Sequence, residues 1–386
     1  MHDEILISED AFLHRMARLR NGVLQALALE RCASPSRVGS IYSGCVARIQ
    51  PGMDAAFVTI EPGLQGLLSL AHPQCPASLR QGQRLLVQVT RDSVGDKRPQ
   101  LSAVLGLPGS HLVLLASRQG TGLSRRIQDP ASRRRLGSLL AELAAGIEGA
   151  GLLARTAAAD APEALLREEA RLLAVRWQAL HAAPALQGPP RVLVQELPFA
   201  QRVLRDLPGP TPCTIRVADA ETAAALRSWC AVYRPAFAPL VEYAGGSVPL
   251  SIRRGVDTAI ESLLQPRVAL PSGGSLIIEQ TSAMTTVDVN TGAGSGSSDA
   301  ALTANLEAVA AVPRELRLRG IGGLIAVDFV SLTDSAAWRQ VLDALQPALE
   351  EDGACGRVHR VDPLGVVLFT RRQAGAPLSE LVRGHD

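Results

Sequence analysis

The stretch MTTVDVNTGAGSG, residues 284–296, decides the fold of the second half of this chain. It begins as an alternating apolar strand, carries Asp288 and Asn290 two positions apart, and then breaks into glycine and serine. Because strand side chains at positions i and i+2 point to the same face, we expect these two polar groups to lie together. The glycine and serine run lets the chain turn away and leaves the end of the strand open.

A second strand with a single charge follows in the stretch IGGLIAVDFVSL, residues 321–332, where the charge is Asp328. An ionised carboxylate in such a run is unfavourable unless it is paired, hydrogen-bonded or bound to a metal. Between the two strands, helical spacing ends near Gly320, with a kink or an early end expected at Pro313. Strand, helix and strand predict a right-handed βαβ unit with parallel strands, which brings both carboxylates to one sheet edge.

Two carboxylates at one edge favour a hard divalent cation, Mg²⁺ or Mn²⁺, with water filling the remaining positions. Such an ion can activate water and stabilise negative charge on a phosphodiester. A structural alternative stays open, because an Asp-x-Asn turn and an aspartate that caps a neighbouring loop would have the same sequence.

The bulk composition predicts a soluble cytoplasmic protein of two to four structural units, since 386 residues exceed one ordinary core. Apolar residues make up 47% of the chain, yet no apolar run reaches the 18 residues of a membrane span. The acidic, alternating N-terminus does not resemble a signal peptide. Its six scattered cysteines lack CxxC spacing, which favours reduced thiols over disulfides or a zinc site.

Four further segments have distinct patterns. Residues 1–34 predict a strand followed by a helix, on the helical spacing of Met16, Leu19, Val23, Leu24 and Leu27. Residues 37–103 predict a small β-barrel, from short alternating strands and turns at Pro51-Gly52 and Pro62-Gly63. Residues 104–190 predict strands and then a helix that starts near Asp160, and residues 191–263 mix strands with alanine-rich helices.

Charge is distributed unevenly, although the net charge is only +2. Lys97 is the single lysine, and five arginines gather within residues 122–137. Guanidinium groups suit phosphate, so this cluster is a candidate phosphate contact, while a solvated helix face is the plain alternative.

Three long stretches, taken together and in this order, resemble the ribonuclease E/G endoribonucleases. They are IYSGCVARIQPGMDAAFVTIEPGLQGLLSL, LPSGGSLIIEQTSAMTTVDVNTGAGSG and TANLEAVAAVPRELRLRGIGGLIAVDFVSLTD. The resemblance implies a mixed α/β and β multidomain fold. An S1-type OB barrel at 35–103 is inserted in an RNase H-like element made of 1–34 and 191–263. A 5′-sensor covers 104–190, and a DNase I-like catalytic subdomain covers 264–386.

The resemblance also implies the chemistry. Asp288 and Asp328 match the metal-binding carboxylates, and Asn290 matches the residue that orients the catalytic site. Family members use Mg²⁺ to cut single-stranded, A/U-rich RNA into products with 5′-phosphate and 3′-hydroxyl ends, and Mn²⁺ is an alternative ion.

A pocket for a 5′-monophosphate is implied by two shorter matches. GLLARTAA places its arginine and threonine at Arg155 and Thr156, and GSHLVLL places backbone contacts at Gly109 and Val113. An arginine fork with a hydroxyl and backbone N–H groups suits a phosphate. Without the family context, a surface ion pair is the favoured interpretation of Arg155.

RNA contacts outside the pocket are implied at four positions. Phe57 matches a stacking aromatic, Lys97 a basic contact, and Arg125 and Arg126 fall in the sensor segment. Stacking would hold any base. The alternative for Phe57 is a buried barrel residue.

Departures from the family pattern shape the expected partners. Leu67 stands where a second stacking aromatic is expected, Arg357 is a candidate match to a family arginine, and the CPxC zinc link with its small domain is not found. We therefore expect a monomer or a metal-free oligomer, with no zinc and no zinc-linked tetramer. The expected partner is single-stranded RNA, and no association with a membrane is expected. A non-catalytic RNA-binding relative remains the rival to the enzyme.

Overall fold

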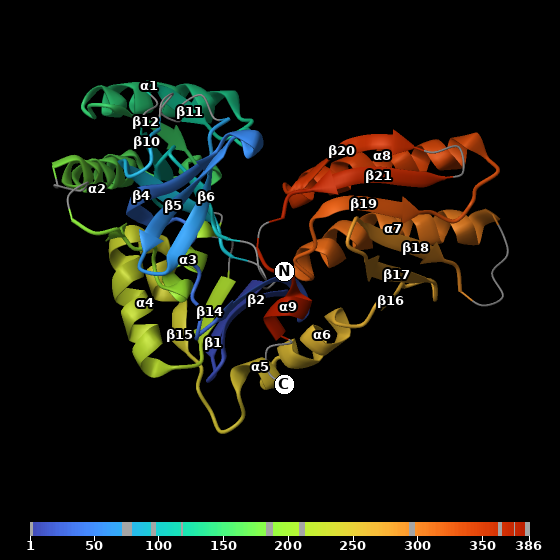
Figure 1. Ribbon diagram of the computed structural model, residues 1–386. Helices are drawn as coiled ribbons and strands as arrows, with labels where there is room; N and C mark the ends of the chain where they lie inside the picture. Colours follow the sequence, from blue (N-terminus) through green and yellow to red (C-terminus); the bar gives the residue numbers. More distant parts are fainter. Residues whose placement is uncertain are drawn as a thin grey trace. The chain divides into compact units, whose positions relative to one another are not determined.

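Two compact units divide the chain in the computed structural model, and each combines separate stretches of the sequence. The structure describes residues 3–71, 79–93, 98–116, 119–182, 188–207, 213–292, 298–361, 365–373 and 375–382. One unit comprises Met1–Ser8, Arg15–Arg31 and Gly245–Asp386, and the other comprises Glu9–His14 and Cys32–Ala244. Figure 1 labels the elements along the chain.

The N-terminal stretch forms three strands, β1 (Asp3–Glu9), β2 (Leu13–Arg20) and β3 (Val23–Arg31), in the order β1-β2-β3. The helix expected from residue 16 onward is therefore wrong. Asn21 and Gly22 both have positive φ, at 50° and 79°, which is the backbone of a tight hairpin turn. This Asn-Gly pair joins two strands, so the apolar spacing in this stretch does not indicate a helix.

The predicted barrel is confirmed as a closed five-stranded, OB-like barrel. Its strands pair in the closed order β4-β5-β6-β8-β7-β4, and β13 (Arg191–Val194) adds to β4 outside the ring. The ring strands are β4 (Ile41–Gln50), β5 (Ala55–Glu61), β6 (Leu64–Ser69), β7 (Arg84–Arg91) and β8 (Gln100–Ser102). A Cβ on Gly44 would lie 2.5 Å from Val58, so this glycine lets the barrel close tightly. The expected turn at Pro51-Gly52 is the 3₁₀ turn η1 (Pro51–Met53).

The segment after the barrel is a four-stranded sheet packed on two helices, which contains the strands and the helix near Asp160 predicted for residues 104–190. The strand order is β11-β12-β10-β9, and Leu112, Leu114 and Leu152 meet Leu140 and Leu166 of the helices in one core. The elements are β9 (Gly106–Pro108), β10 (Leu112–Ala116), β11 (Thr121–Leu123), α1 (Pro130–Ala145), β12 (Ala150–Ala154), η2 (Thr156–Ala158) and α2 (Glu163–Ala182).

Residues 191–263 alternate short strands and helices, as the sequence predicts. Strands β14 and β15 pair in parallel, and α4 lies between them in the chain. The remaining elements are α3 (Phe199–Asp206), β14 (Cys213–Val217), α4 (Ala220–Tyr233), η3 (Pro235–Leu240), β15 (Val241–Tyr243), α5 (Leu250–Arg253) and α6 (Val256–Leu263).

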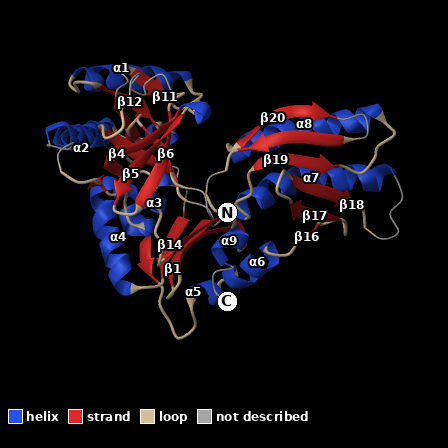
Figure 2. Ribbon diagram, in the orientation of Figure 1, coloured by secondary structure: helices blue, strands red, loops and turns tan. Residues whose placement is uncertain are grey.

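The C-terminal region contains the predicted βαβ unit within a six-stranded sheet of order β16-β17-β18-β19-β21-β20. Figure 2 shows its strands beside the two long helices α7 and α8. The elements are β16 (Arg267–Ala269), β17 (Ser275–Gln280), β18 (Thr285–Asn290), α7 (Ser298–Leu318), β19 (Gly323–Asp328), α8 (Ser335–Asp352), β20 (Cys355–Val361), β21 (Val366–Arg371) and α9 (Leu378–Val382). Both long helices pack against one face of the sheet, because their buried residues share one core with alternate strand residues.

Helix α7 runs through Pro313 and continues to Leu318, so the early end, one of the two outcomes expected at this proline beside a kink, is wrong. Val309, Val312 and Leu316 are buried on either side of it. Their packing against the sheet stabilises the helix across the position where proline removes a backbone hydrogen bond. Gly320 then ends the helix region with a φ of 65°, as expected.

Candidate active site

Asp288 and Asp328 lie side by side on neighbouring strands. Strands β18 and β19 run parallel, and the register pairs Asp288 directly with Asp328. Neighbouring strands are about 4.8 Å apart, and paired residues point to the same face. Val287 and Val327, one position earlier, are buried beneath the helices, whereas both aspartates are exposed on the opposite face. The alternation of the two strands therefore presents two carboxylates together to solvent.

Asn290 joins this pair at the last position of β18. Its side-chain amide donates a hydrogen bond of 2.8 Å to Oδ2 of Asp288. Gly274 packs closely against the backbone of Asn290, because a Cβ at this position would lie 2.5 Å from the carbonyl oxygen of Asn290. The amide thus fixes one carboxylate oxygen of Asp288, and the other oxygen keeps its lone pairs for a ligand.

The chain beyond Asp328 is held by a residue that the sequence reasoning missed. Asn305 of α7 is fully buried, donates to the carbonyl oxygen of Val330 at 2.8 Å and accepts from the Val330 N–H at 2.9 Å. This paired contact fixes the backbone two residues after Asp328. An asparagine on the apolar face of a predicted helix was the signal, because such a side chain needs a buried partner.

Arg155 lies directly after β12, and its fork is held by two acceptors. Nη1 donates to the carbonyl oxygen of Gly109 at 2.7 Å, and Nη2 donates to Asp206 at 2.8 Å. The alternative interpretation of Arg155 as an ion pair is thus present in this structure. Although burial acts to raise it, the guanidinium groups of Arg205 and Arg155 hold the pKa of Asp206 below its usual value.

The buried acid Glu169 lies against Gly109 and leaves no room for a side chain at this position. A Cβ at Gly109 would lie 1.9 Å from Oε1 of Glu169, so a side chain has no room there. Glu169 accepts hydrogen bonds from the backbone N–H of His111 at 3.0 Å and from its Nδ1 at 2.7 Å. The N–H of Gly109 donates to the carbonyl oxygen of Leu112, and the carbonyl oxygen of Gly109 accepts the hydrogen bond from Nη1 of Arg155.

The other residues predicted for the phosphate pocket are Thr156 and Val113. Thr156 is exposed, and its hydroxyl lies 2.9 Å from that of Ser124. Val113 is a half-buried residue of β10 in register with Leu153 of β12. The structure therefore brings Arg155, Thr156 and Gly109 together, with Val113 on the adjoining strand.

Arg125 and Arg126 follow Ser124 in the turn after β11, and both are exposed. The N–H of Arg126 donates to the Ser124 hydroxyl at 3.3 Å, which links this turn to Thr156. Other arginines of the cluster serve the fold. Arg133 donates to the carbonyl oxygen of Ile127 at 2.8 Å, and Arg135 donates to that of Ala159 at 2.6 Å.

Phe57 of the barrel is half-buried and lies against two cations. The guanidinium carbons of Arg48 and Arg98 are 5.1 and 5.0 Å from the centre of its ring. Arg98 also lines a hollow of about 500 Å³. Neither arginine was singled out in the sequence, because their approach to Phe57 depends on how the barrel closes.

Two other expectations for the barrel concern positions near Phe57. Leu67, which replaces the expected second aromatic, lies on β6 directly across from Phe57. Lys97 lies outside the described residues, next to Arg98.

Comparisons with known proteins complete the description of the site. The model of the Ribonuclease E/G family matches residues 106–374. Ribonuclease G of Escherichia coli strain K12 is 36% identical over 97% of this chain and 80% of its own length. Ribonuclease G of Salmonella typhimurium is 35% identical over the same shares. Ribonuclease E of Nostoc sp. is 34% identical over 89% of this chain and 52% of its own length.

An OB-like barrel in one chain with an α/β sheet that presents paired carboxylates, together with these matches, defines a ribonuclease. The chain belongs to the ribonuclease E/G family, as the resemblance in the sequence indicated. It is an endoribonuclease, a phosphodiester hydrolase of RNA processing or decay.

Proposed function

We propose that the chain is a Mg²⁺-dependent endoribonuclease that cleaves single-stranded, A/U-rich RNA and leaves 5′-phosphate and 3′-hydroxyl ends. The observation that carries the proposal is the register pair of Asp288 and Asp328, with Asn290 hydrogen-bonded to Asp288. Exposed carboxylate oxygens on a shared face fit Mg²⁺, which prefers one or two carboxylates and several waters, and Mn²⁺ is an alternative.

In this proposal, Asp288 and Asp328 hold the ion, and the bound ion would activate water and stabilise charge on the phosphodiester. The chain's own residues supply position. Asn290 keeps one oxygen of Asp288 engaged, so that the carboxylate meets its ligand in one orientation. Asn305 fixes the backbone that follows Asp328. Such supporting contacts keep a metal ligand from reorganising during reaction.

A 5′-monophosphate is the proposed activator, bound at Arg155 and Thr156 near Gly109 and Val113. Arg155 is oriented by the carbonyl oxygen of Gly109, and the neighbouring Thr156 is exposed, which supports a guanidinium and a hydroxyl as phosphate ligands. Phosphate would compete with Asp206 for the Nη2 end of Arg155. Arg125 and Arg126 are proposed to contact the RNA beside this pocket.

RNA is proposed to lie on the barrel at Phe57, with Lys97 as a basic contact. Base stacking on an aromatic ring accepts any base, and Arg48 and Arg98 add cations at the same ring. The subdomain boundaries are part of the proposal: RNase H-like 1–34 and 191–263, S1-type 35–103, sensor 104–190 and DNase I-like 264–386.

A cytoplasmic monomer or metal-free oligomer, not linked through zinc into a tetramer, completes the proposal. Five of the six cysteines lie in the described part of the chain, and these five carry no disulfide bond. Among the helices of the described ranges, none has the length and apolar character needed to cross a membrane.

A cleavage assay tests the proposal directly. Fluorescent A/U-rich RNA bearing a 5′-monophosphate or a 5′-hydroxyl is incubated with the full chain in Mg²⁺ or in EDTA. We expect Mg²⁺-dependent cuts that disappear in Asp288→Asn and in Asp328→Asn, while RNA binding persists. Arg155→Ala should reduce cleavage of the monophosphate substrate and spare the hydroxyl substrate.

The rival function is a non-catalytic RNA-binding relative. Binding without Mg²⁺-dependent cleavage, unchanged by either aspartate substitution, would favour this rival. An equal loss on both substrates in Arg155→Ala would remove the sensor from the proposal and leave the catalytic part intact.

A further inference from the structure

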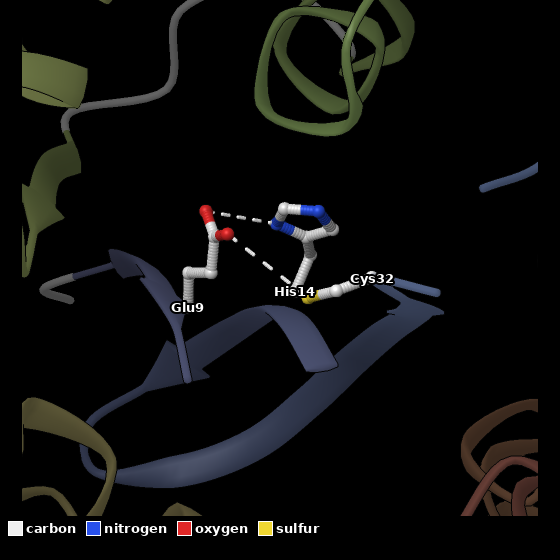
Figure 3. A group of neighbouring side chains, drawn as sticks. All are labelled: Glu9, His14 and Cys32. Carbon is white, nitrogen blue, oxygen red and sulfur yellow. Dashed lines mark hydrogen bonds and ion pairs between the residues drawn. The ribbon is translucent and has the colours of Figure 1, made fainter. Parts of the chain in front are cut away.

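Three side chains with metal-binding atoms meet far along the chain from the paired aspartates. They are Glu9, the last residue of β1, His14 near the start of β2, and Cys32, directly after β3. One ligand atom from each lies within 4.8 Å of the others. Figure 3 shows the carboxylate, the imidazole and the sulfur converging on one space.

The distances within this group suit a single small cation. His14 Nδ1 lies 3.1 Å from Glu9 Oε2, and Cys32 Sγ lies 4.0 Å from Glu9 Oε1. Ligand atoms around a tetrahedral zinc ion are separated by roughly 3.3–3.8 Å, given bonds of 2.0–2.3 Å. Small side-chain rotations would therefore bring all three atoms into contact with one ion.

The backbone around the three ligands is already ordered by hydrogen bonds. Asp10 Oδ1 accepts from the N–H groups of Phe12 and Leu13, each at 2.8 Å. The N–H of Cys32 donates to the carbonyl oxygen of Phe12 at 2.8 Å, which ties the cysteine to the turn between Glu9 and His14. The ligand-bearing segments are thus held in place before any ion binds.

The imidazole of His14 is also positioned by a neighbour. Its ring stacks on Phe199 of α3, with centroids 5.6 Å apart and an interplanar angle of 19°. A fixed ring keeps Nδ1 directed toward Glu9. Orientation of a ligating histidine by its surroundings is a regular feature of metal sites.

We propose that Glu9, His14 and Cys32 form a binding site for Zn²⁺. One thiolate, one imidazole and one carboxylate are a ligand set for a borderline cation and a poor one for Mg²⁺, which demands oxygen. The site is at the surface, since the Glu9 side chain is 54% exposed, so water can take the fourth position. Binding releases the thiol proton of Cys32, and zinc takes the place of the 3.1 Å contact between Glu9 and His14.

The role proposed for the ion is structural. It would connect the end of β1, the start of β2 and the residue after β3 through bonds stronger than the present contacts. No ligand spacing in the sequence indicates the group, because Glu9 and His14 lie on β1 and β2 and Cys32 directly follows β3. The proposal is independent of the Mg²⁺ site and stands or falls separately from it.

Cobalt titration of the full chain tests the site. The protein is treated with EDTA, dialysed and titrated with Co²⁺, and the thiolate-to-cobalt charge-transfer absorption is recorded. We expect one equivalent of this band, its displacement by Zn²⁺, and a higher Tm with Zn²⁺ present. Cys32→Ser should abolish the band, and Glu9→Gln and His14→Gln should weaken Co²⁺ binding at least about tenfold.

Two controls make the outcome decisive. Cys45→Ser removes another half-buried thiol and should leave the band unchanged. Asp288→Asn should leave it unchanged as well, because oxygen ligands give no thiolate band. The proposal is overturned if the native chain shows no band, if Cys32→Ser retains it, or if Cys45→Ser loses it equally. Because Glu9 is exposed, Glu9→Gln is expected to fold normally, and full-strength Co²⁺ binding in that variant would also overturn the proposal.

Discussion

At the scale of single residues, the amide of Asn290 fixes one oxygen of Asp288 through a hydrogen bond of 2.8 Å. Replacing it in Asn290→Ala frees the carboxylate to rotate while both aspartates remain. We expect Mg²⁺-dependent cleavage to fall about 10- to 100-fold, the usual effect of removing a residue that orients a metal ligand. The measurement is the cleavage rate as a function of Mg²⁺ concentration, with a higher Mg²⁺ requirement in the variant.

Thr286 is the matched control for this experiment. It lies two residues before Asp288 on the same face of β18, and its hydroxyl contacts the carbonyl oxygen of Glu279. Thr286→Ala should keep the wild-type rate. If Asn290→Ala also keeps it, the amide does not orient the site and that part of the proposed function is wrong.

Asp206 is a second residue whose effect can be isolated. Its carboxylate binds Nη2 of Arg155 at 2.8 Å and would compete with, and repel, a bound phosphate. In Asp206→Asn the competing charge is gone while the shape is kept. We expect the ratio of cleavage rates on 5′-monophosphate and 5′-hydroxyl RNA to rise about twofold to fivefold. This range corresponds to the free energy that a half-exposed ion pair contributes.

The opposite result has a clear meaning. Arg205 also binds Asp206, at 3.0 Å, and it keeps a second acid partner in Glu196 at 2.7 Å. A fall in the substrate ratio for Asp206→Asn would show that the carboxylate holds Arg155 in place for phosphate, and the competition would be refuted.

At the scale of elements, local chemistry explains which parts of the fold were predictable. Strands β18 and β19 each have one continuous apolar pattern. Their strand conformation and their parallel pairing can therefore be predicted from the sequence alone. The helix predicted from Met16 onward is wrong because its apolar spacing outweighed Asn21-Gly22, a turn signal that favours a hairpin. The early end expected at Pro313 is wrong for the opposite reason, because burial of its helix outweighed the local preference of proline.

The candidate site was predictable only where neighbours in the sequence become neighbours in space. Asp288 and Asn290 need one strand, and Asp328 needs one crossover. Arg155 depends instead on Gly109 and Asp206, which approach it from separate elements through tertiary packing. No single-sequence pattern encodes that approach. Gly109 was named only through the family resemblance, and Asp206 could not be named before the structure.

A buried ion pair between two elements gives a prediction about acid stability. Asp352 ends α8, and its Oδ2 accepts from Nε of Arg371, the last residue of β21, at 2.9 Å. Although burial acts to raise it, the hydrogen bond and charge of Arg371 lower the pKa of Asp352 below 3.8. The pair therefore contributes stability that is fully present above about pH 4–5 and is lost as the pH falls through the lowered pKa.

Asp352→Asn should reduce the free energy of unfolding near neutral pH by about 3–5 kcal/mol, because it leaves Arg371 buried without its anion. The difference from wild type should narrow as the pH falls below about 4, where the native pair is itself lost. Denaturant unfolding at several pH values measures both effects. Asp343→Asn, an exposed position on the same helix, should change stability little. A constant difference across this pH range would contradict the role given to the pair.

At the scale of the whole molecule, a net charge of +2 gives little long-range attraction for RNA. Many arginines are engaged within the fold, as Arg133 and Arg135 are with carbonyl oxygens and Arg205 is with two acids. We therefore expect RNA affinity to come from a few exposed guanidinium groups near the proposed RNA contacts. Arg48 and Arg98, both exposed beside Phe57, are the barrel's candidates.

The salt dependence of RNA binding measures this directly, because each phosphate neutralised on a single strand contributes a slope of about 0.7 in log K against log salt. Replacing both Arg48 and Arg98 by alanine should reduce the slope by about 1.4 and weaken binding at low salt most. Arg167→Ala is the matched control, since Arg167 is exposed but bound to Glu142 and Glu163 at 2.7 and 2.6 Å. Fluorescence anisotropy with a non-cleavable single strand gives the slopes. An unchanged slope in the double variant, or an equal change in the Arg167 control, would place the RNA away from this face of the barrel.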